Sequence, residues 1–198
     1  MLLSLSVIPS FNASGVLPPF SGSTPTDRAS QAPYRTTMLA IAQRFGTSIE
    51  RKAILNGLLD YRHELRARGL GNGFQWIDGS FIENVELNRG RPPADIDIVT
   101  VVRRPGGMSA DDFGNFIDNN LDIIDPSIIK RQYKVDGYFI DLDADAEIVA
   151  LDAVYWSGLF SHQRVTSLWK GMLSVSLESD DEEARNHLAE GQNNAQAA

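Results

Sequence analysis

The stretch Asp95-Ile96-Asp97-Ile98-Val99-Thr100-Val101-Val102 decides the fold class of this chain. Its β-branched run from Ile96 to Val102 lies between Pro93 and Pro105, which predicts a buried strand. Two aspartates stand two residues apart at its opening, so their side chains point to the same face of that strand. Like charges at that distance repel each other unless a cation neutralises them. The pattern therefore predicts a cation site at the start of a buried strand.

The residues before this strand favour a phosphate ligand. Carboxylates such as those of Asp95 and Asp97 suit Mg²⁺ or Mn²⁺, which recruit substrate phosphates to complete their coordination. Upstream, Gly79-Ser80 follows a predicted short strand at residues 74–77 and precedes a predicted helical turn at residues 81–87. Such a turn presents backbone N–H groups to an anion, and glycine permits its close approach. Together these features predict a site for a metal ion and a nucleotide.

A third carboxylate on a neighbouring strand would complete such a metal site. Residues 133–142 are predicted to form a strand, and this region offers Asp136, Asp141 and Asp143. Because side chains alternate along a strand, Asp136 lies on the opposite face from the other two. Only one of these sets can face the metal, and either remains possible at this stage.

The remaining elements define a mixed α/β class. The expected order is α, α, β, α, β, α, β, which indicates an α/β or α+β fold with a mostly buried sheet. The expected helices are residues 37–45 with Thr36 as cap, a helix opened by the Thr47/Glu50 capping box and closed before Gly69, residues 110–121 with Ser109 as cap, and residues 146–160. Residues 169–177 are predicted to form a last strand.

Length, composition and charge indicate one soluble domain. The 198 residues contain 42% hydrophobic residues and no cysteine, which excludes disulfides and thiolate metal sites. We expect an N-terminal arm at residues 1–35, a domain at residues 36–178 and a flexible acidic tail at residues 179–198. The apolar start meets Pro9 too early for a membrane span, so a cytoplasmic location is expected.

The charge distribution disfavours non-specific nucleic-acid binding. From Glu178 onward, six acidic residues and one arginine carry −5 of the net charge of −8, which leaves −3 for the remainder. A nearly balanced body offers no basic stripe to neutralise phosphates.

The motifs together resemble the nucleotidyltransferase superfamily related to DNA polymerase β. The resemblance is carried by a strand, Gly79-Ser80, a helical turn, Asp95-Ile96-Asp97 framed by hydrophobic residues, and a third aspartate on the next strand. More closely, residues 8–9, 15–19, 45–65, 76–81, 92–97, 135–143 and 155–170 resemble a group of small bacterial and phage proteins labelled nucleotidyltransferase-like. The resemblance implies a nucleotidyltransferase-like mixed β-sheet flanked by helices.

The resemblance also implies a chemistry. Asp95 and Asp97 would bind two Mg²⁺ (or Mn²⁺) ions, and Ser80, after Gly79, would contact the β- or γ-phosphate of an NTP. A third aspartate would help to activate an acceptor hydroxyl, which attacks the α-phosphorus and expels pyrophosphate. The position of the third aspartate in the family motif favours Asp136, whereas the hydrophobic neighbours of Asp141 make that residue the alternative.

Two features depart from the family pattern. Many active members carry a basic residue soon after the Gly-Ser pair, but Phe81, Ile82 and Glu83 stand here, and the loop at residues 88–93 is long. The negative charge of the triphosphate must therefore be neutralised by other basic residues. The candidates are Arg89, Arg91, Arg103, Arg104 and Lys134.

An aromatic segment offers further candidates. Residues 155–164 and 169–171 are dense in aromatic side chains, which is typical of a buried core. The alternative is that His162, Arg164 or Lys170 reaches the phosphates or the acceptor.

The sequence therefore predicts transfer of a nucleoside monophosphate from an NTP to a hydroxyl of a protein, an RNA end or a small molecule. The alternative is a non-catalytic protein of the same fold, either a nucleotide sensor or a protein-binding component of a toxin–antitoxin or phage-defence system. The absence of a basic residue after Ser80 favours this alternative, and the Asp95/Asp97 pair opposes it.

Overall fold

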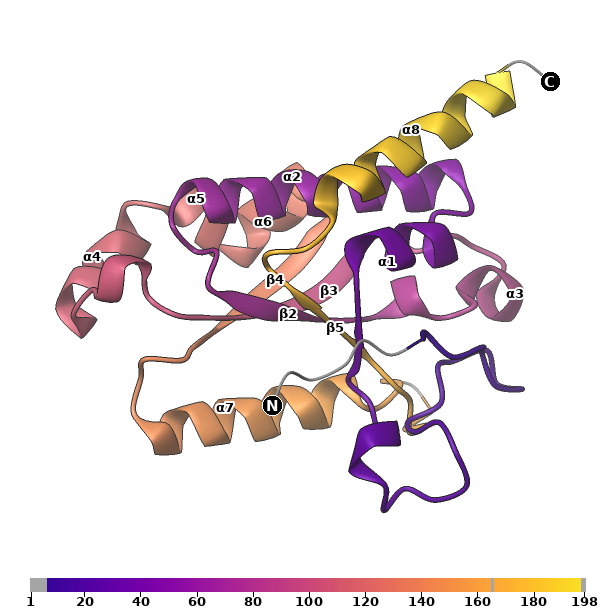
Figure 1. Ribbon diagram of the computed structural model, residues 1–198, viewed down its shortest axis with the longest axis horizontal. Helices are drawn as coiled ribbons and strands as arrows, with labels where there is room; N and C mark the ends of the chain where they lie inside the picture. The colour runs from indigo at the N-terminus through magenta and orange to yellow at the C-terminus, as the bar shows by residue number, and fades with distance from the viewer. Residues whose placement is uncertain (1–6, 165, 197–198) are drawn as a thin grey trace.

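One five-stranded mixed sheet forms the centre of the protein (Figure 1). The computed structural model describes residues 7–164 and 166–196. The strands are β1 (Tyr34–Thr36), β2 (Gly73–Asp78), β3 (Ile96–Val102), β4 (Val135–Asp141) and β5 (Leu173–Ser176), in the order β1-β5-β2-β3-β4. β2 is antiparallel to both of its neighbours, whereas β1 pairs with β5 and β3 with β4 in parallel. The predicted mixed α/β class is thus confirmed.

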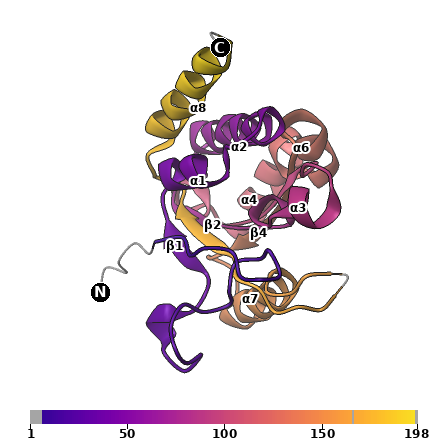
Figure 2. The same ribbon diagram turned by 90° about the vertical axis from the view of Figure 1, so that its right-hand side faces the viewer.

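Helices cover both faces of this sheet (Figures 1 and 2). One face carries most of them, and the other carries α7 together with part of the N-terminal arm. The helices are α1 (Met38–Phe45), α2 (Ile49–Ala67), α3 (Val85–Arg89), α4 (Ala110–Asp118), α5 (Leu121–Ile124), α6 (Pro126–Tyr133), α7 (Ala146–Phe160) and α8 (Asp181–Gln196), with short 3₁₀ turns η1 (Arg28–Ser30), η2 (Ser80–Ile82) and η3 (Pro105–Gly107). No helix among the described residues is long and apolar enough to cross a bilayer.

Several predicted elements are confirmed, and others begin elsewhere. The strand from Ile96 to Val102 and the helix from Ala146 to Phe160 have the predicted bounds. The first two helices each begin one residue later than expected, because Thr37 and Ser48 supply the capping oxygens in place of Thr36 and Thr47.

The sequence prediction missed three elements. β1 is a three-residue strand with little periodicity to reveal it, and α5 is a single turn. α6 has a readable start signal, since Asp125 accepts hydrogen bonds from the first-turn amides and Pro126 occupies the first helical position. Tyr133 therefore ends α6 rather than opening β4, and it packs against the ring of Tyr61.

The N-terminal arm lies against the body. Val16 and Leu17 are buried although the surrounding residues are mostly in turns and loops. The backbone N–H of Gly171 donates to the carbonyl of Leu17, which attaches the arm next to the start of β5.

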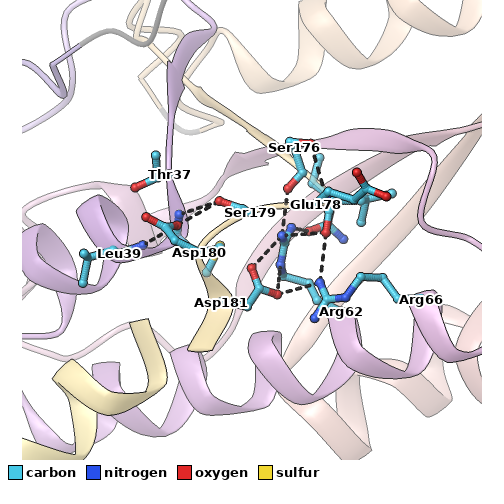
Figure 3. Close-up of polar contacts among 12 residues, drawn as sticks. Thr37, Leu39, Arg62, Arg66, Ser176, Glu178, Ser179, Asp180 and Asp181 are labelled. Atoms are coloured by element: carbon cyan, nitrogen blue, oxygen red, sulfur yellow. Dashed lines mark hydrogen bonds and ion pairs between the residues drawn. The ribbon is translucent and has the colours of Figure 1, made fainter. Parts of the chain in front are cut away.

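The acidic tail begins as an integral helix instead of a flexible extension. Ala184 and Leu188 of α8 are buried, and this helix packs against α1 and α2. Its first residues also form polar contacts with the body (Figure 3). The backbone N–H of Leu39 donates to Asp180, at the start of α1.

A fully buried arginine connects α2, the sheet and α8. The guanidinium of Arg62 donates to both carboxylate oxygens of Asp181 at 2.9 Å and to the side chain of Gln75 on β2 at 2.8 Å (Figure 3). It also donates to the carbonyl of Ser176 at the end of β5. A buried cation requires this complete set of partners, because an unpaired charge in a low dielectric is strongly unfavourable. Asp181 is therefore part of the fold.

We expect Asp181→Asn to lower the free energy of unfolding by about 3–5 kcal/mol, because it leaves the Arg62 charge buried without its counter-ion. Asp60→Asn is the matched control, since Asp60 is 57% exposed where it pairs with Arg185 and its loss should change stability by less than about 1 kcal/mol. Urea denaturation of the three proteins measures both effects. Equal losses in the two variants would show that the buried pair is not required.

Candidate functional site

The ends of three adjacent strands bring the predicted carboxylates together. Asp97 of β3 is the register partner of Asp78 at the end of β2 and of Asp136 at the start of β4. Cross-strand partners point to the same face of a sheet, so these three side chains share one face. This face is the one that carries α7, because Tyr138, two residues after Asp136, packs on Trp156 with ring centroids 4.5 Å apart.

Gly79 is required by the approach of Asp97. Its φ is +80°, a conformation that favours glycine. A side chain at this position would overlap the carboxylate of Asp97. Ser80 follows as the first residue of η2 and lines the same cleft as Asp97. The Gly-Ser pair and the aspartate pair are therefore parts of one structure.

A buried lysine neutralises the end of β2. The ammonium of Lys170 lies 2.7 Å from Asp78 and 3.2 Å from Glu83, and its side chain is only 3% exposed. Burial raises the pKa of Asp78 to about 7, against the opposing effect of Lys170. Lys170 thus belongs to the site by position, but its charge is already compensated within the protein.

A second lysine lies between two of the other carboxylates. The ammonium of Lys130 on α6 is 2.8 Å from Asp95 and 2.8 Å from Asp136. Asp97 has no such direct partner among the described ion pairs. Burial, followed by repulsion from Asp95 and Asp136, raises its pKa to about 6. The cluster is therefore only partly neutralised.

These groups line one cleft of about 710 Å³. The carboxylates at the strand ends line it together with residues of α7 and of the loop that follows α7. Along the chain, its lining residues are Asp78, Gly79, Ser80, Glu83, Arg89, Asp95, Asp97, Lys130, Asp136, Tyr138, Tyr155, Trp156, Leu159, Phe160, His162, Gln163, Arg164 and Lys170. Figure 2 shows α7 beneath the sheet. Four aromatic side chains line the cleft, and we call them the aromatic wall: Tyr138 of β4 and Tyr155, Trp156 and Phe160 of α7.

The two candidates for the third carboxylate occupy opposite ends of β4. Asp136 lines the cleft, whereas Asp141 pairs with Val102 at the far end of β3 and forms an ion pair with Arg104. Asp143 lies at that far end as well, where it forms an ion pair with Arg103. Of the candidates, only Asp136 shares the cleft with Asp95 and Asp97.

Of the basic residues that the sequence predicts to bind phosphate, some line the cleft and others lie outside it. Arg91 is exposed and donates to the carbonyl of Pro92, and Lys134 is exposed at the end of α6, so neither lines the cleft. Arg89, Lys170 and Arg164 do line it.

The structure adds Lys130, Asp78 and Glu83 to the site, which the sequence prediction did not include. The sequence contains one weak indication that Lys130 belongs to the site: it lies in the last turn of a helix that leads directly into the strand of Asp136.

The chemistry of the donor set suits a divalent cation. Asp95, Asp97 and Asp136 supply hard oxygen ligands beside one another, with unbalanced repulsion at Asp97. Within residues 7–164 and 166–196, however, no three His, Cys, Asp or Glu side chains are arranged as a ready metal site. The ammonium of Lys130 takes up the place between two of the candidate ligands.

Comparison with known proteins assigns the chain to a family. Residues 9–176 match the family model described as a family of unknown function, DUF6932, and the chain belongs to that family. No curated protein and no solved structure matches the chain.

We expect Gly79→Ala to destabilise the protein by at least about 2 kcal/mol, because the new methyl group meets the Asp97 carboxylate and the positive φ is strained. Gly158→Ala in α7 is the matched control: a methyl group there meets open space and should be neutral or stabilise the helix by up to about 1 kcal/mol. Thermal and urea unfolding give the comparison. Similar stabilities of both variants would contradict the close approach of Gly79 and Asp97.

Proposed function

We propose that this protein is a cytoplasmic, metal-dependent nucleotidyltransferase with a nucleotidyltransferase-like fold. The observation that carries the proposal is the convergence of Gly79-Ser80, Asp95, Asp97 and Asp136 in one cleft. These groups lie on three different strands or directly beside them, and the carboxylates of Asp95 and Asp136 repel that of Asp97. Such a cluster is unfavourable for stability alone, which supports a function that uses a cation.

The residues have distinct roles in this proposal. Asp95, Asp97 and Asp136 hold Mg²⁺ or Mn²⁺, which would supply charge neutralisation and polarise the phosphate oxygens. Ser80 and the backbone at the start of η2 face the terminal phosphates of the NTP. Asp136 helps to remove the proton of the acceptor hydroxyl. The acceptor oxygen then bonds to the α-phosphorus, the bond from that phosphorus to the bridging oxygen breaks, and pyrophosphate leaves.

The aromatic wall supplies a surface for the nucleobase. Tyr138 and Trp156 lie in contact within the lining of the cleft, and Tyr155 meets Trp156 edge-on. Stacking on aromatic side chains tolerates every base, because each base has a π-face. The wall therefore favours nucleotide binding without selecting one NTP.

A specific observation also favours a second candidate, a non-catalytic nucleotide sensor or a protein-binding component of a toxin–antitoxin or phage-defence system. Three of the cations that line the cleft are held in ion pairs: Lys170 with Asp78 and Glu83, Arg89 with Glu83, and Lys130 with Asp95 and Asp136. Their charge is already balanced, which limits what they offer a triphosphate. The retained carboxylate cluster makes the catalytic candidate the stronger one.

Thermal unfolding with Mg²⁺ and each of the four NTPs tests the proposed site. At a hundredfold excess over Kd, we expect at least one metal–NTP pair to raise the Tm by roughly 5–10 °C. The Asp95→Asn/Asp97→Asn variant should fold and lose this shift, because it lacks the metal ligands.

The charge-matched control is Asp141→Asn/Asp143→Asn, at the far end of β4, which should keep the shift. An unchanged shift in the Asp95/Asp97 variant would overturn the metal assignment. The absence of any shift in the wild-type protein would favour the second candidate and direct the search to copurifying proteins.

A further inference from the structure

Lys130 is placed where a bound cation would compete with it. Its ammonium lies 2.8 Å from one oxygen of Asp95 and 2.8 Å from one oxygen of Asp136. Mg²⁺ binds carboxylate oxygens at about 2.0–2.1 Å and excludes other groups from its coordination shell. The ammonium of Lys130 therefore cannot stay in its place when a divalent cation binds between these two carboxylates.

The two lysines of the cleft differ in their freedom to move. Lys170 is 3% exposed and fixed between two buried carboxylates, whereas the side chain of Lys130 is 48% exposed. A flexible four-carbon stem carries the Lys130 ammonium from the last turn of α6, so this head group can swing toward solvent without movement of the helix backbone. Lys130 can thus leave the carboxylates once a divalent cation replaces its charge, whereas Lys170 is enclosed by its partners.

We propose that Lys130 is an internal counter-ion that occupies the metal position in the free protein and is displaced when a divalent cation binds. This inference rests on the proposed function for the identity of the cation. Without a metal, the single positive charge limits repulsion between Asp95 and Asp136 and keeps the strand ends together. A divalent cation contributes a second charge and also reaches Asp97, which Lys130 does not contact.

Displacement has a consequence for the nucleotide. The released ammonium remains at the cleft, since Lys130 is among the residues that line it. It then supplies a cation whose charge is no longer balanced by Asp95 and Asp136. Metal entry would thereby provide the positive charge that the residues after Ser80 do not offer a triphosphate.

The test is a titration with Mn²⁺ alone, followed by electron paramagnetic resonance, on the full chain. Lys130→Met keeps the aliphatic stem and removes the competing charge, so we expect its Kd for Mn²⁺ to be at least about tenfold lower than that of the wild type. Lys130→Arg retains the charge and should keep a Kd close to the wild-type value. Arg131→Met is the control for loss of one positive charge from the same turn of α6, and we expect it to leave the Kd within about twofold, because Arg131 is outside the cleft.

Three results would overturn the inference: an unchanged or weaker Mn²⁺ affinity in Lys130→Met, the same gain in Lys130→Arg, or the same gain in Arg131→Met. Thermal unfolding in EDTA gives a second readout, where Lys130→Met should have a lower Tm than the wild type and recover it on addition of Mn²⁺. Neither measurement uses a nucleotide or an acceptor. A failure of the lysine displacement is therefore separate from a failure of nucleotidyl transfer, which would appear as a lack of product in the wild-type protein.

Discussion

Repulsion among four aspartates at one end of the sheet is the constraint on which the rest of the structure depends. Strands β2, β3 and β4 end or begin at the same place, and burial raises the pKa of Asp78 to about 7 and that of Asp97 to about 6. The four residues are Asp78, Asp95, Asp97 and Asp136. Two lysines from outside these strands supply the compensating charge: Lys170, just before β5, and Lys130, on α6. The positions of β5 and α6 are thus linked to the electrostatics of the cleft.

The opposite face of the same strands is held by a different polar network. Gln75 of β2 receives a hydrogen bond from Arg62 and donates one to Thr100 of β3. Arg62 is completed by Asp181, so the first turn of α8 fixes α2 against the sheet. This hydrogen-bond network, on the face of β2 and β3 opposite the cleft, helps to position the strand ends that carry the carboxylates. Among the described residues, no buried side-chain nitrogen or oxygen lacks a partner, so burial of these charges is fully matched by hydrogen bonds.

Local patterns predicted the parts of the site that lie on single elements. Asp95 and Asp97 share a face because strand alternation requires it. At Gly79 the expected close approach was that of a phosphate, whereas the structure places the carboxylate of Asp97 against this glycine. Alternation could also separate Asp136 from Asp141, but it could not choose between them, since that choice depends on which end of β4 meets β3 at Asp97. The parallel register of the two strands places Asp136 there.

Features that depend on tertiary contacts were not predictable in the same way. Lys130 lies on a helix that the sequence analysis missed, and its role appears only when α6 is packed beside β4. The acidic residues from Glu178 onward have the composition of a solvated tail, but Asp181 is the counter-ion of an arginine more than a hundred residues earlier. Charge alone does not distinguish these cases, because a carboxylate in water and one paired with a buried guanidinium have the same sequence signature.

The most direct test of the account is a crystal structure of the protein with Mn²⁺ and a non-hydrolysable NTP analogue, with anomalous scattering recorded at the manganese edge. We expect an anomalous peak between Asp95, Asp97 and Asp136, with the phosphates near Ser80 and the Lys130 ammonium moved away from the two carboxylates. A structure with nucleotide bound elsewhere, or with no manganese and Lys130 still between Asp95 and Asp136, would contradict it.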